Sequence, residues 1–381
     1  MSGIAWGGVL EPAGIVMIAA VAAVGLIVGL LLTAAVSRLV EPLPRHDHVI
    51  RVAVLAAAVI VAVGSWWMEV SRSTGAVGDG AGHAGPVSGG TARWAGHLIL
   101  AGFLAAASWV DLRHRVIPDV ITVPGVLLGL LWTTVAPGTL LPIERLVPRS
   151  YAPPLIEPDV LGLCGGLHDS WPAWLGSPSA AGLVAALAVF SVWWLIGTEP
   201  TAADGAPATW WRRIVTPRTL VAIMGVGIVA AAWGAGGDHW RGLVSSLGGL
   251  AVAAGMIWLT RAGASYALGR EAMGLGDVTL MAMAGAWLGW QPCVLAVCLA
   301  VFIGLFHGVV QLVMQRDAEL PFGPSLCLGL AAVVVWWRPM WDVTSTAFER
   351  PGELLTVVGI VIALTAASLW IWSRLRPFPA D

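Results

Sequence analysis

Residues 269–290 read GREAMGLGDVTLMAMAGAWLGW and place the carboxylate of Asp277 between a glycine-rich turn and an apolar run. An ionised aspartate at the centre of a membrane helix costs about 2.5 to 3.5 kcal/mol on insertion scales. A carboxylate at this junction is therefore either a cap on a helix end or a group that a reaction at the membrane edge requires. The rest of the sequence decides between these two roles.

The composition of the chain is that of a membrane protein. Of its 381 residues, 58% are hydrophobic and 11% are charged, whereas soluble domains carry about 25% charged residues. A soluble globule could not cover its surface with so few polar groups. The net charge of −2 at pH 7 and the lack of a basic stretch give no indication of nucleic-acid binding. All 20 basic residues are arginines, which excludes a lysine Schiff base or a Ser-Lys dyad.

Eleven stretches are apolar enough to cross a bilayer, which takes about 20 residues per helix. They are residues 13–36, 52–69, 94–110, 118–136, 180–197, 219–235, 243–260, 277–290, 291–314, 325–337 and 353–372. The sequence thus predicts an all-α polytopic membrane protein with about 10–12 transmembrane helices. Because the first ten residues carry no positive charge, we expect no cleavable signal peptide.

The placement of arginine predicts the orientation of these spans. With the N-terminus outside, thirteen arginines fall in cytoplasmic segments and seven in outer segments. The excess of positive charge on cytoplasmic loops favours this orientation over its inverse. Asp111 and Asp277 then both lie at the cytoplasmic face.

We divide the chain into five regions. Residues 1–93 hold two spans, a short cytoplasmic loop and a glycine-rich outer linker, and residues 94–136 hold the Asp111 span with its partner. Residues 137–242 hold an outer segment rich in Pro and Trp, expected to form a small cap, and additional spans. The Asp277 region covers residues 243–337, and the last span lies in residues 338–381. GxxxG pairs such as Gly125/Gly129 and Gly285/Gly289 favour close helix packing.

Two acids lie at span ends on the same predicted membrane face. Asp111 ends the run GFLAAASWVD (residues 102–111), and Asp277 begins the run DVTLMAMAGAWLG. Taken singly, Asp277 could cap a helix and Asp111 could pair with Arg113 or Arg115. Taken together they favour an aspartate dyad, because two carboxyls about 3 Å apart share one proton. One can then act as a base on water while the other polarises a carbonyl.

Three segments resemble the type IV prepilin peptidases, a family of bacterial GxGD intramembrane aspartyl proteases. Residues 269–290 resemble its GxGD segment, DLRHRVIPDVITVPGVLLGL (residues 111–130) its first aspartate segment, and LPFGPSLCLGL (residues 320–330) its PFGP segment. The resemblance implies the GxGD protease architecture and cleavage of the leader from prepilins or pseudopilins. It also implies the bacterial inner membrane, an active site facing the cytoplasm, and neither metal nor cofactor. The expected partners are the prepilin substrates and the lipid bilayer.

The resemblance also implies roles by position. Asp111 and Asp277 would be the catalytic pair. The GxGD glycines would let a substrate backbone approach Asp277, since they lack a Cβ. Two acids, Asp119 and Glu271, would support the site or contact a basic leader, although caps and solubility also explain them. The supporting or substrate-binding set is Gly274, Gly276, Asp119, Glu271, Pro321, Phe322, Gly323 and Pro324.

The chain departs from the family pattern in three ways. Asp111 and Asp277 are 166 residues apart, because two extra spans and their loops lie between them; an even number of added spans keeps both acids on one side. Thr279 replaces the lysine usual two positions after the GxGD aspartate. The cytoplasmic domain with paired CxxC motifs, which supports N-methylation in bifunctional relatives, is absent between the first two spans, where SRLVEPLPRHDHVIRV has no cysteine. We therefore expect no N-methyltransferase activity.

Other classes fit the sequence less well. A zinc protease needs HExxH, which the chain lacks, and His46 with His48 forms only an isolated HxH. A serine protease of the rhomboid kind has only Ser265 and His307 as candidates, and a presenilin-like protease would need a PAL segment. The alternative from another class is a non-catalytic transporter or secretion-complex scaffold. A transporter is expected to show inverted repeats or charges at mid-span, and neither is present.

Overall fold

The described part of the computed structural model is mainly helical. It comprises residues 90–145, 155–158, 172–198, 217–269, 271, 273–313 and 322–348, with scattered residues before 65 and after 351. The chain divides into two compact units, Met1–Ala106 and Ala107–Asp381. Helix α3 (Gly90–His114) begins in the first unit and ends in the second. The predicted spans 13–36, 52–69 and 353–372 lie almost entirely outside the described residues.

The described residues of the first unit include a small apolar cluster. Val21, Ala62 and Leu98 are buried together, and Val63 and Trp94 pack against them. The indole N–H of Trp94 donates to the carbonyl of Ala62 at 3.1 Å. This bond ties α3 to a segment far away in the sequence.

The second unit carries the remaining helices. They are α4 (Asp119–Val135), α5 (Ala173–Gly176), α6 (Ala180–Gly197), α8 (Pro217–Ala235), α9 (Gly237–Leu268), α10 (Leu275–Leu288), α11 (Trp290–Val313) and α12 (Gly323–Phe348). Within the described residues, five helices (α3, α6, α8, α9 and α12) are long and apolar enough to cross a membrane, and α4, α10 and most of α11 are shorter apolar helices. The predicted class, an all-α polytopic membrane protein, is confirmed.

The largest differences between predicted and observed helix boundaries are in α9 and α12. Helix α9 begins at Gly237 rather than at residue 243, and its 32 residues extend about 48 Å. Helix α12 continues past residue 337 to Phe348 through a kink at Trp336, close to Pro339. Proline removes a backbone donor and crowds the preceding turn, so the sequence break at this point is a kink within one helix rather than an end.

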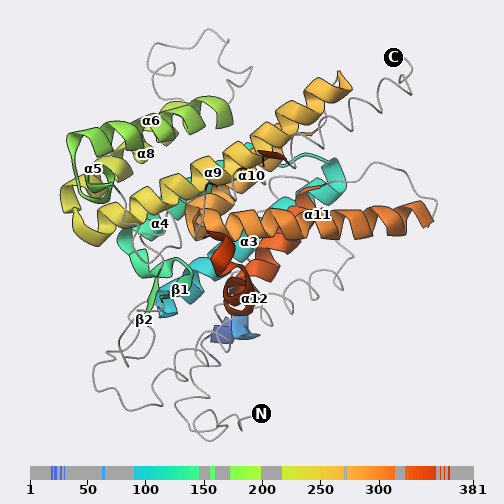
Figure 1. Cartoon of the computed structure of the whole chain (residues 1–381), viewed down its shortest axis with the longest axis horizontal. Coiled ribbons are helices and arrows are strands. Elements are labelled where there is room, and N and C mark those ends of the chain that lie inside the picture. The colour runs from blue at the N-terminus through green and yellow to red at the C-terminus, as the bar shows by residue number, and fades with distance from the viewer. Residues whose placement is uncertain are drawn as a thin grey trace, which may run out of the picture. The chain divides into compact units, whose positions relative to one another are not determined.

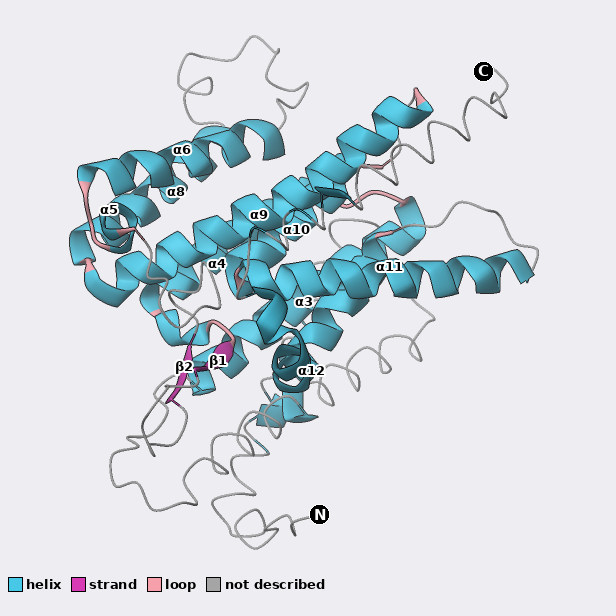
Figure 2. Ribbon diagram, in the orientation of Figure 1, coloured by secondary structure: helices cyan, strands magenta, loops and turns pink. Residues whose placement is uncertain are grey.

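Part of the outer segment forms a small two-stranded sheet, which is the one departure from the all-helical expectation among the described residues (Figure 2). Strands β1 (Pro142–Arg145) and β2 (Leu155–Pro158) pair antiparallel, with Ile143 opposite Glu157. The short 3-10 helix η2 (Pro137–Thr139) precedes them. Nearby in sequence, α5 is tied to the start of α9, because the indole N–H of Trp240 donates to the carbonyl of Leu175 at 2.7 Å. This bond joins a described part of the outer segment to helix α9.

Helix α10 is the centre of the second unit. All its residues from Asp277 to Leu288 are buried, and it packs against α4 and α9, which lie beside it in Figure 1. A Cβ on Gly285 would overlap the backbone of Gly249 in α9, so these two glycines let the helices touch. On the other side, Gly129 leaves room for Trp287, whose indole N–H donates to the carbonyl of Gly125 at 2.8 Å. The GxxxG pairs thus serve close packing.

The helices of the 137–242 region, α6 and α8, pack on this same core. They pack against each other, with the ring of Phe190 in the space that Gly225 leaves open. Helix α8 also contacts α4, and α6 contacts α9. The indole N–H of Trp194 donates to the carbonyl of Arg218 at 3.0 Å, and the Arg218 guanidinium lies 4.8 Å from the centre of the Trp194 ring. The insertion is therefore built into the second unit.

The connections bring several helix ends to one place. The segment after α3 contacts the first turn of α10 through Ile117 and Gly276, and the start of α12 contacts Asp111 through Gly323. At the opposite end of these helices, Leu140 lies next to Gly289, and the rings of Trp290 and Phe348 are 5.4 Å apart. The end of α3 and the starts of α4, α10 and α12 thus share one end of the unit.

Candidate active site

Asp111 lies in the last turn of α3 and is 5% exposed. The backbone N–H of Gly323, the first residue of α12, donates to its carboxylate. Its Oδ2 atom is buried and makes no hydrogen bond within the described residues. Arg113, a predicted partner of Asp111, lies over the Trp109 ring at 4.7 Å from its centre. Asp111 is thus held by the N-terminus of a helix, where the helix dipole favours negative charge.

Asp277 lies in the first turn of α10 and is 9% exposed. The residue that caps this helix is Gly274, three positions earlier, and no side chain caps it. Asp277 therefore does not cap this helix, which was one of the two roles that the sequence left open for it. Its carboxylate is a buried acid inside the first turn rather than an exposed cap.

The two carboxylates are near neighbours in the structure. Asp111 interacts electrostatically with Asp277, and the thiol of Cys327 in α12 interacts with both. The Cys327 thiol also has a hydrogen bond with the backbone of Ser108, one turn before Asp111. The fold therefore brings together two acids that are 166 residues apart in the sequence.

Ile117 holds the elements of the site in contact. A Cβ on Gly276 would stand 2.9 Å from the Ile117 Cβ and 3.0 Å from its carbonyl oxygen. A Cβ on Gly323 would stand 3.0 Å from the Ile117 Cδ1 and 2.5 Å from Asp111 Oδ2. Packing therefore explains why positions 276 and 323 are glycine, because Ile117 fills the space that a side chain there would need. Around Gly274 the nearest atom to such a Cβ is 3.9 Å away, so that position is open.

The chain reaches Ile117 through a turn of unusual backbone geometry. Helix α3 ends at His114, and Arg115 has a φ of 57°, in the left-handed region that only a few non-glycine residues occupy. Its backbone N–H donates to the carbonyl of Asp111 at 2.8 Å. This turn reverses the chain directly after Asp111 and directs Ile117 back toward the acids.

Thr279 lies on the side of α10 away from Asp277. Two residues along a helix correspond to a rotation of about 200°. Thr279 is buried, and its hydroxyl donates to the carbonyl of Gly276 at 3.0 Å. Its Cγ2 would be 3.7 Å from a Cβ on Gly197, the last residue of α6. The insertion therefore approaches α10 at the position where the family usually has a lysine.

The structure places the supporting residues in different surroundings. Glu271 is 82% exposed and pairs with Arg261 of α9, with its Oε1 2.7 Å from Nη2. Asp119 is the exposed first residue of α4. Phe322 packs near Gly304 of α11, and Pro324 is buried as the second residue of α12. Pro321 lies outside the described residues.

Three residues near the acids were not among the predicted site residues. Ile117 lies within the first aspartate segment, but an isoleucine gives no chemical signal that marks it. Cys327 lies in the third segment, and its position close enough to interact with both acids depends on how α12 packs. Arg261 is a charge near the end of a span, which a sequence reading counts only toward orientation.

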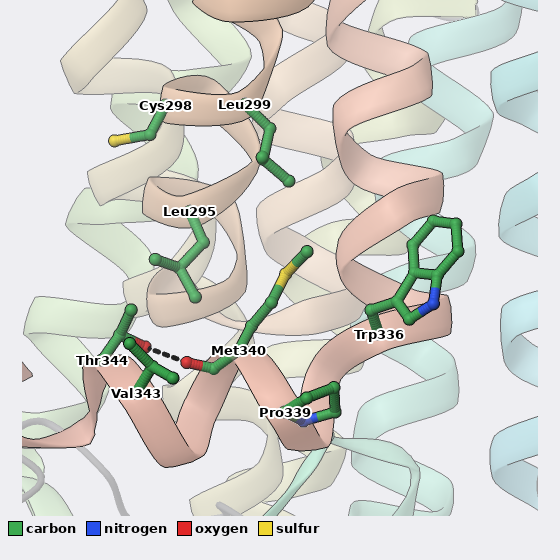
Figure 3. Close-up of a pocket in the computed structure, with 8 residues that line it drawn as sticks. All are labelled: Leu295, Cys298, Leu299, Trp336, Pro339, Met340, Val343 and Thr344. Atoms are coloured by element: carbon green, nitrogen blue, oxygen red, sulfur yellow. Dashed lines mark hydrogen bonds between the residues drawn. The ribbon is translucent and has the colours of Figure 1, made fainter.

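An apolar pocket elsewhere in the unit contains none of the candidate site residues (Figure 3). It has a volume of about 450 Å³ and lies between α11 and α12, beside the kink of α12. The lining residues are Leu295, Cys298, Leu299, Trp336, Pro339, Met340, Val343 and Thr344. With no carboxylate in its lining, this pocket is not a candidate for acid-base chemistry.

The arrangement around Asp111 and Asp277 is suited to acid-base chemistry. Within the part of the chain that the structure describes, no group of three or more His, Cys, Asp or Glu side chains could hold a metal ion. His46 and His48 lie outside that part. Two buried carboxyls that interact electrostatically cannot both carry a charge at low cost, so protonation of one of them is favoured. One carboxylate and one carboxylic acid are the groups that general acid-base chemistry requires.

Comparison with known proteins agrees with the resemblance found in the sequence. Residues 98–149 and 210–309 match the model of the type IV leader peptidase family. A prepilin leader peptidase/N-methyltransferase of Stutzerimonas stutzeri is 27% identical over 187 residues, 48% of this chain and 58% of that protein. Proteins of the same name from Pseudomonas aeruginosa and Pectobacterium carotovorum subsp. carotovorum are 39% and 36% identical over 22% and 24% of this chain.

The matched part spans little more than half of these relatives at most, namely 58%, 29% and 37% of their respective lengths. No solved structure matches the chain. The matched segments contain Asp111, Asp277 and α8, whereas α6 lies in the unmatched residues 150–209. The predicted resemblance to the type IV leader peptidase family is confirmed.

The two GxGD glycines have different surroundings, which predicts different effects of substitution. Gly276→Ala should lower the free energy of unfolding by about 1–3 kcal/mol, because its methyl group would be pressed into Ile117. Gly274→Ala should leave stability nearly unchanged, because its φ of −67° is ordinary and its surroundings are open. Thermal or denaturant unfolding of both variants in detergent would measure this difference. Equal stabilities would contradict the packing role of Ile117.

Proposed function

Because its matched segments relate the chain to the type IV leader peptidases, we propose that it is a membrane-embedded aspartic endopeptidase. It removes the leader peptide from type IV prepilins or pseudopilins. The observation that supports this function best is the proximity of Asp111 and Asp277, two buried acids contributed by different helices. Helix capping does not explain the burial of Asp277, since Gly274 is the cap residue of α10.

The proposed reaction uses the two aspartates as one unit. The ionised carboxylate takes a proton from a water molecule, and the protonated one donates a hydrogen bond to the carbonyl of the scissile peptide. The water oxygen then bonds to the carbonyl carbon, and the C–N bond breaks as the amine takes up a proton. The Oδ2 atom of Asp111 is buried and makes no hydrogen bond within the described residues, so it has lone pairs to offer to a water molecule or substrate in the site.

The helix ends around the acids support this chemistry. The N–H of Gly323 and the N-terminus of α12 stabilise a negative charge on Asp111. Asp277 is itself in the first turn of α10, where a negative charge is also favoured. These dipoles are fixed before substrate binds, so little reorganisation is needed during the reaction.

The apolar surroundings suit a substrate that enters from the membrane. Leader cleavage takes place just before the hydrophobic N-terminal helix of the mature subunit, so that helix can stay in the lipid while the bond is cut. The 14 residues of α10 extend about 21 Å, less than the hydrocarbon thickness of about 30 Å. The exposed acids Asp119 and Glu271 are candidates for contact with a basic leader.

Substitution of either aspartate tests the proposed chemistry. Asp111→Asn and Asp277→Asn should each lower leader cleavage by more than about 10³-fold, because a dyad that has lost one member has lost its shared proton. The measurement is processing of a prepilin from the same genome by the purified variant, with membrane insertion checked in parallel. Asp238→Asn, which changes an exposed aspartate at the start of α9, is the control and should cleave normally. Normal processing by either dyad variant would refute the assignment.

We also propose that the protein lies in the bacterial inner membrane with the active site toward the cytoplasm. The arginine distribution and the shared end of Asp111 and Asp277 support this orientation. Reporter fusions at Arg113, Arg213 and Arg270 should therefore read cytoplasmic, and fusions at Gly82 and Ala152 should read external. Reporters that place Arg113 and Arg270 on opposite sides would rule out a dyad of Asp111 and Asp277.

Our last proposal is that cleavage takes place without N-methylation, although the names of the relatives include both activities. The segment between Arg38 and Arg51 is short and holds no thiolate for a structural zinc. We expect mature pilin with a free N-terminal amine when this protein acts alone with S-adenosylmethionine supplied. Mass spectrometry of the product tests this, and a mature N-terminus heavier by one methyl group would overturn it.

A further inference from the structure

The segment that joins α9 to α10 sets the position of Asp277. Helix α9 ends at Leu268, and Gly269 has a left-handed φ of 68°, with its N–H donating to the carbonyl of Ser265 at 2.9 Å. The chain must then turn and begin α10 at Leu275, with Gly274 as its cap. Asp277 follows that cap by three residues. Any shift of residues 271–274 therefore moves the carboxylate.

One arginine bonds this segment at two points. The Nε–H of Arg261 donates to the carbonyl of Met273 at 2.8 Å, and its Nη2 donates to Glu271 Oε1 at 2.7 Å. Met273 directly precedes the cap residue Gly274. Because the guanidinium is planar and rigid, two bonds from different nitrogens fix the backbone and side chain of the segment at once.

Packing does little to hold this segment in place. Gly274 is exposed, and a Cβ added to it would meet only one atom within 4 Å, the Gly276 nitrogen at 3.9 Å. Glycines at positions 269, 274 and 276 also give the backbone more freedom than other residues would. The Arg261 side chain, by contrast, is only 23% exposed and lies on the rigid helix α9. Among the contacts of the described residues, the hydrogen bonds of Arg261 are therefore the main constraint on the positions of residues 271 and 273.

We propose that Arg261 is a positioning residue for the candidate active site, which holds the 271–274 segment so that α10 presents Asp277 to Asp111. This inference rests on the proposed peptidase function. We call the two Arg261 hydrogen bonds, to Met273 and to Glu271, the clamp. The proposal also changes the interpretation of Glu271: one of its carboxylate oxygens accepts a bond of the clamp, and the exposed remainder of the side chain is what a basic leader could contact. Arg261 acts through Asp277 and touches no reacting atom.

Three substitutions separate the parts of the clamp. Arg261→Gln removes the charge and both hydrogen bonds in their present geometry. The kcat for leader cleavage should therefore fall by about 10- to 100-fold with KM nearly unchanged. Displacement of a reacting group by about 1 Å has an effect of this size. Arg261→Lys retains the charge but cannot donate to both acceptors at once, and its kcat should fall less than that of Arg261→Gln. Glu271→Gln leaves the bond between Arg261 and Met273 in place, and its kcat should fall least of the three.

Helix α9 offers a matched control at its other end. Arg241 also bonds a carboxylate and a backbone carbonyl, with Nη1 3.4 Å from Asp238 Oδ1 and Nε 3.3 Å from the Gly176 oxygen. Arg241→Gln is therefore the same chemical change on the same helix, remote from the acids, and kcat should not change. A fall in kcat equal to that of Arg261→Gln would show a general effect on α9 and would overturn the proposal, as would a change in KM alone.

A second measurement does not depend on cleavage. Amide hydrogen exchange of residues 271–277 should be at least about 10-fold faster in Arg261→Gln than in the wild type, and unchanged in Arg241→Gln. If Arg261→Gln does not fold, the same comparison is made with Arg261→Lys. Unchanged exchange in an active enzyme overturns the clamp alone. Faster exchange in a protein whose wild type cleaves no prepilin supports the clamp and refutes the proposed function.

Discussion

The packing of Ile117 between Gly276 and Gly323 is the contact on which the geometry of the candidate site depends. It joins three segments of the chain: the turn after α3, the first turn of α10 and the start of α12. Each glycine permits an approach that any side chain would prevent. This contact therefore helps to fix the position of Asp111 relative to Asp277.

Burial gives this contact its chemical consequence. A carboxylate removed from water is costly unless hydrogen bonds or dipoles compensate for it. Here the compensation comes from helix ends: Gly323 donates its N–H to Asp111, and Asp277 is part of the first turn of α10. The same helix ends that the glycines bring together therefore also supply the electrostatic environment of the acids. Packing and electrostatics cannot be altered independently at this site.

The helices inserted between the two aspartates extend the packing of the core. Helix α8 contacts α4, and α6 contacts α9 and approaches α10 at Thr279. A long charged side chain at position 279 would meet the end of α6, whereas threonine fits there and bonds back to Gly276. Thr279 and the insertion are thus physically related departures from the family pattern. The insertion supports α10 from the side opposite Asp277.

The sequence alone determined the membrane class, most helices of the second unit and the two aspartates proposed as the catalytic pair. Those features follow from local information: apolar runs of sufficient length and a carboxylate next to GxG. It did not determine that Gly274, rather than Asp277, caps α10, or why Gly276 must lack a side chain. Nor did it indicate that Arg261, seven positions before the end of α9, bonds Glu271 and Met273. These three features depend on which helices are in contact and on how far each helix is shifted along its axis. Contacts between residues distant in sequence, such as Ile117 with Gly276, set that arrangement, so only the tertiary structure decided these features.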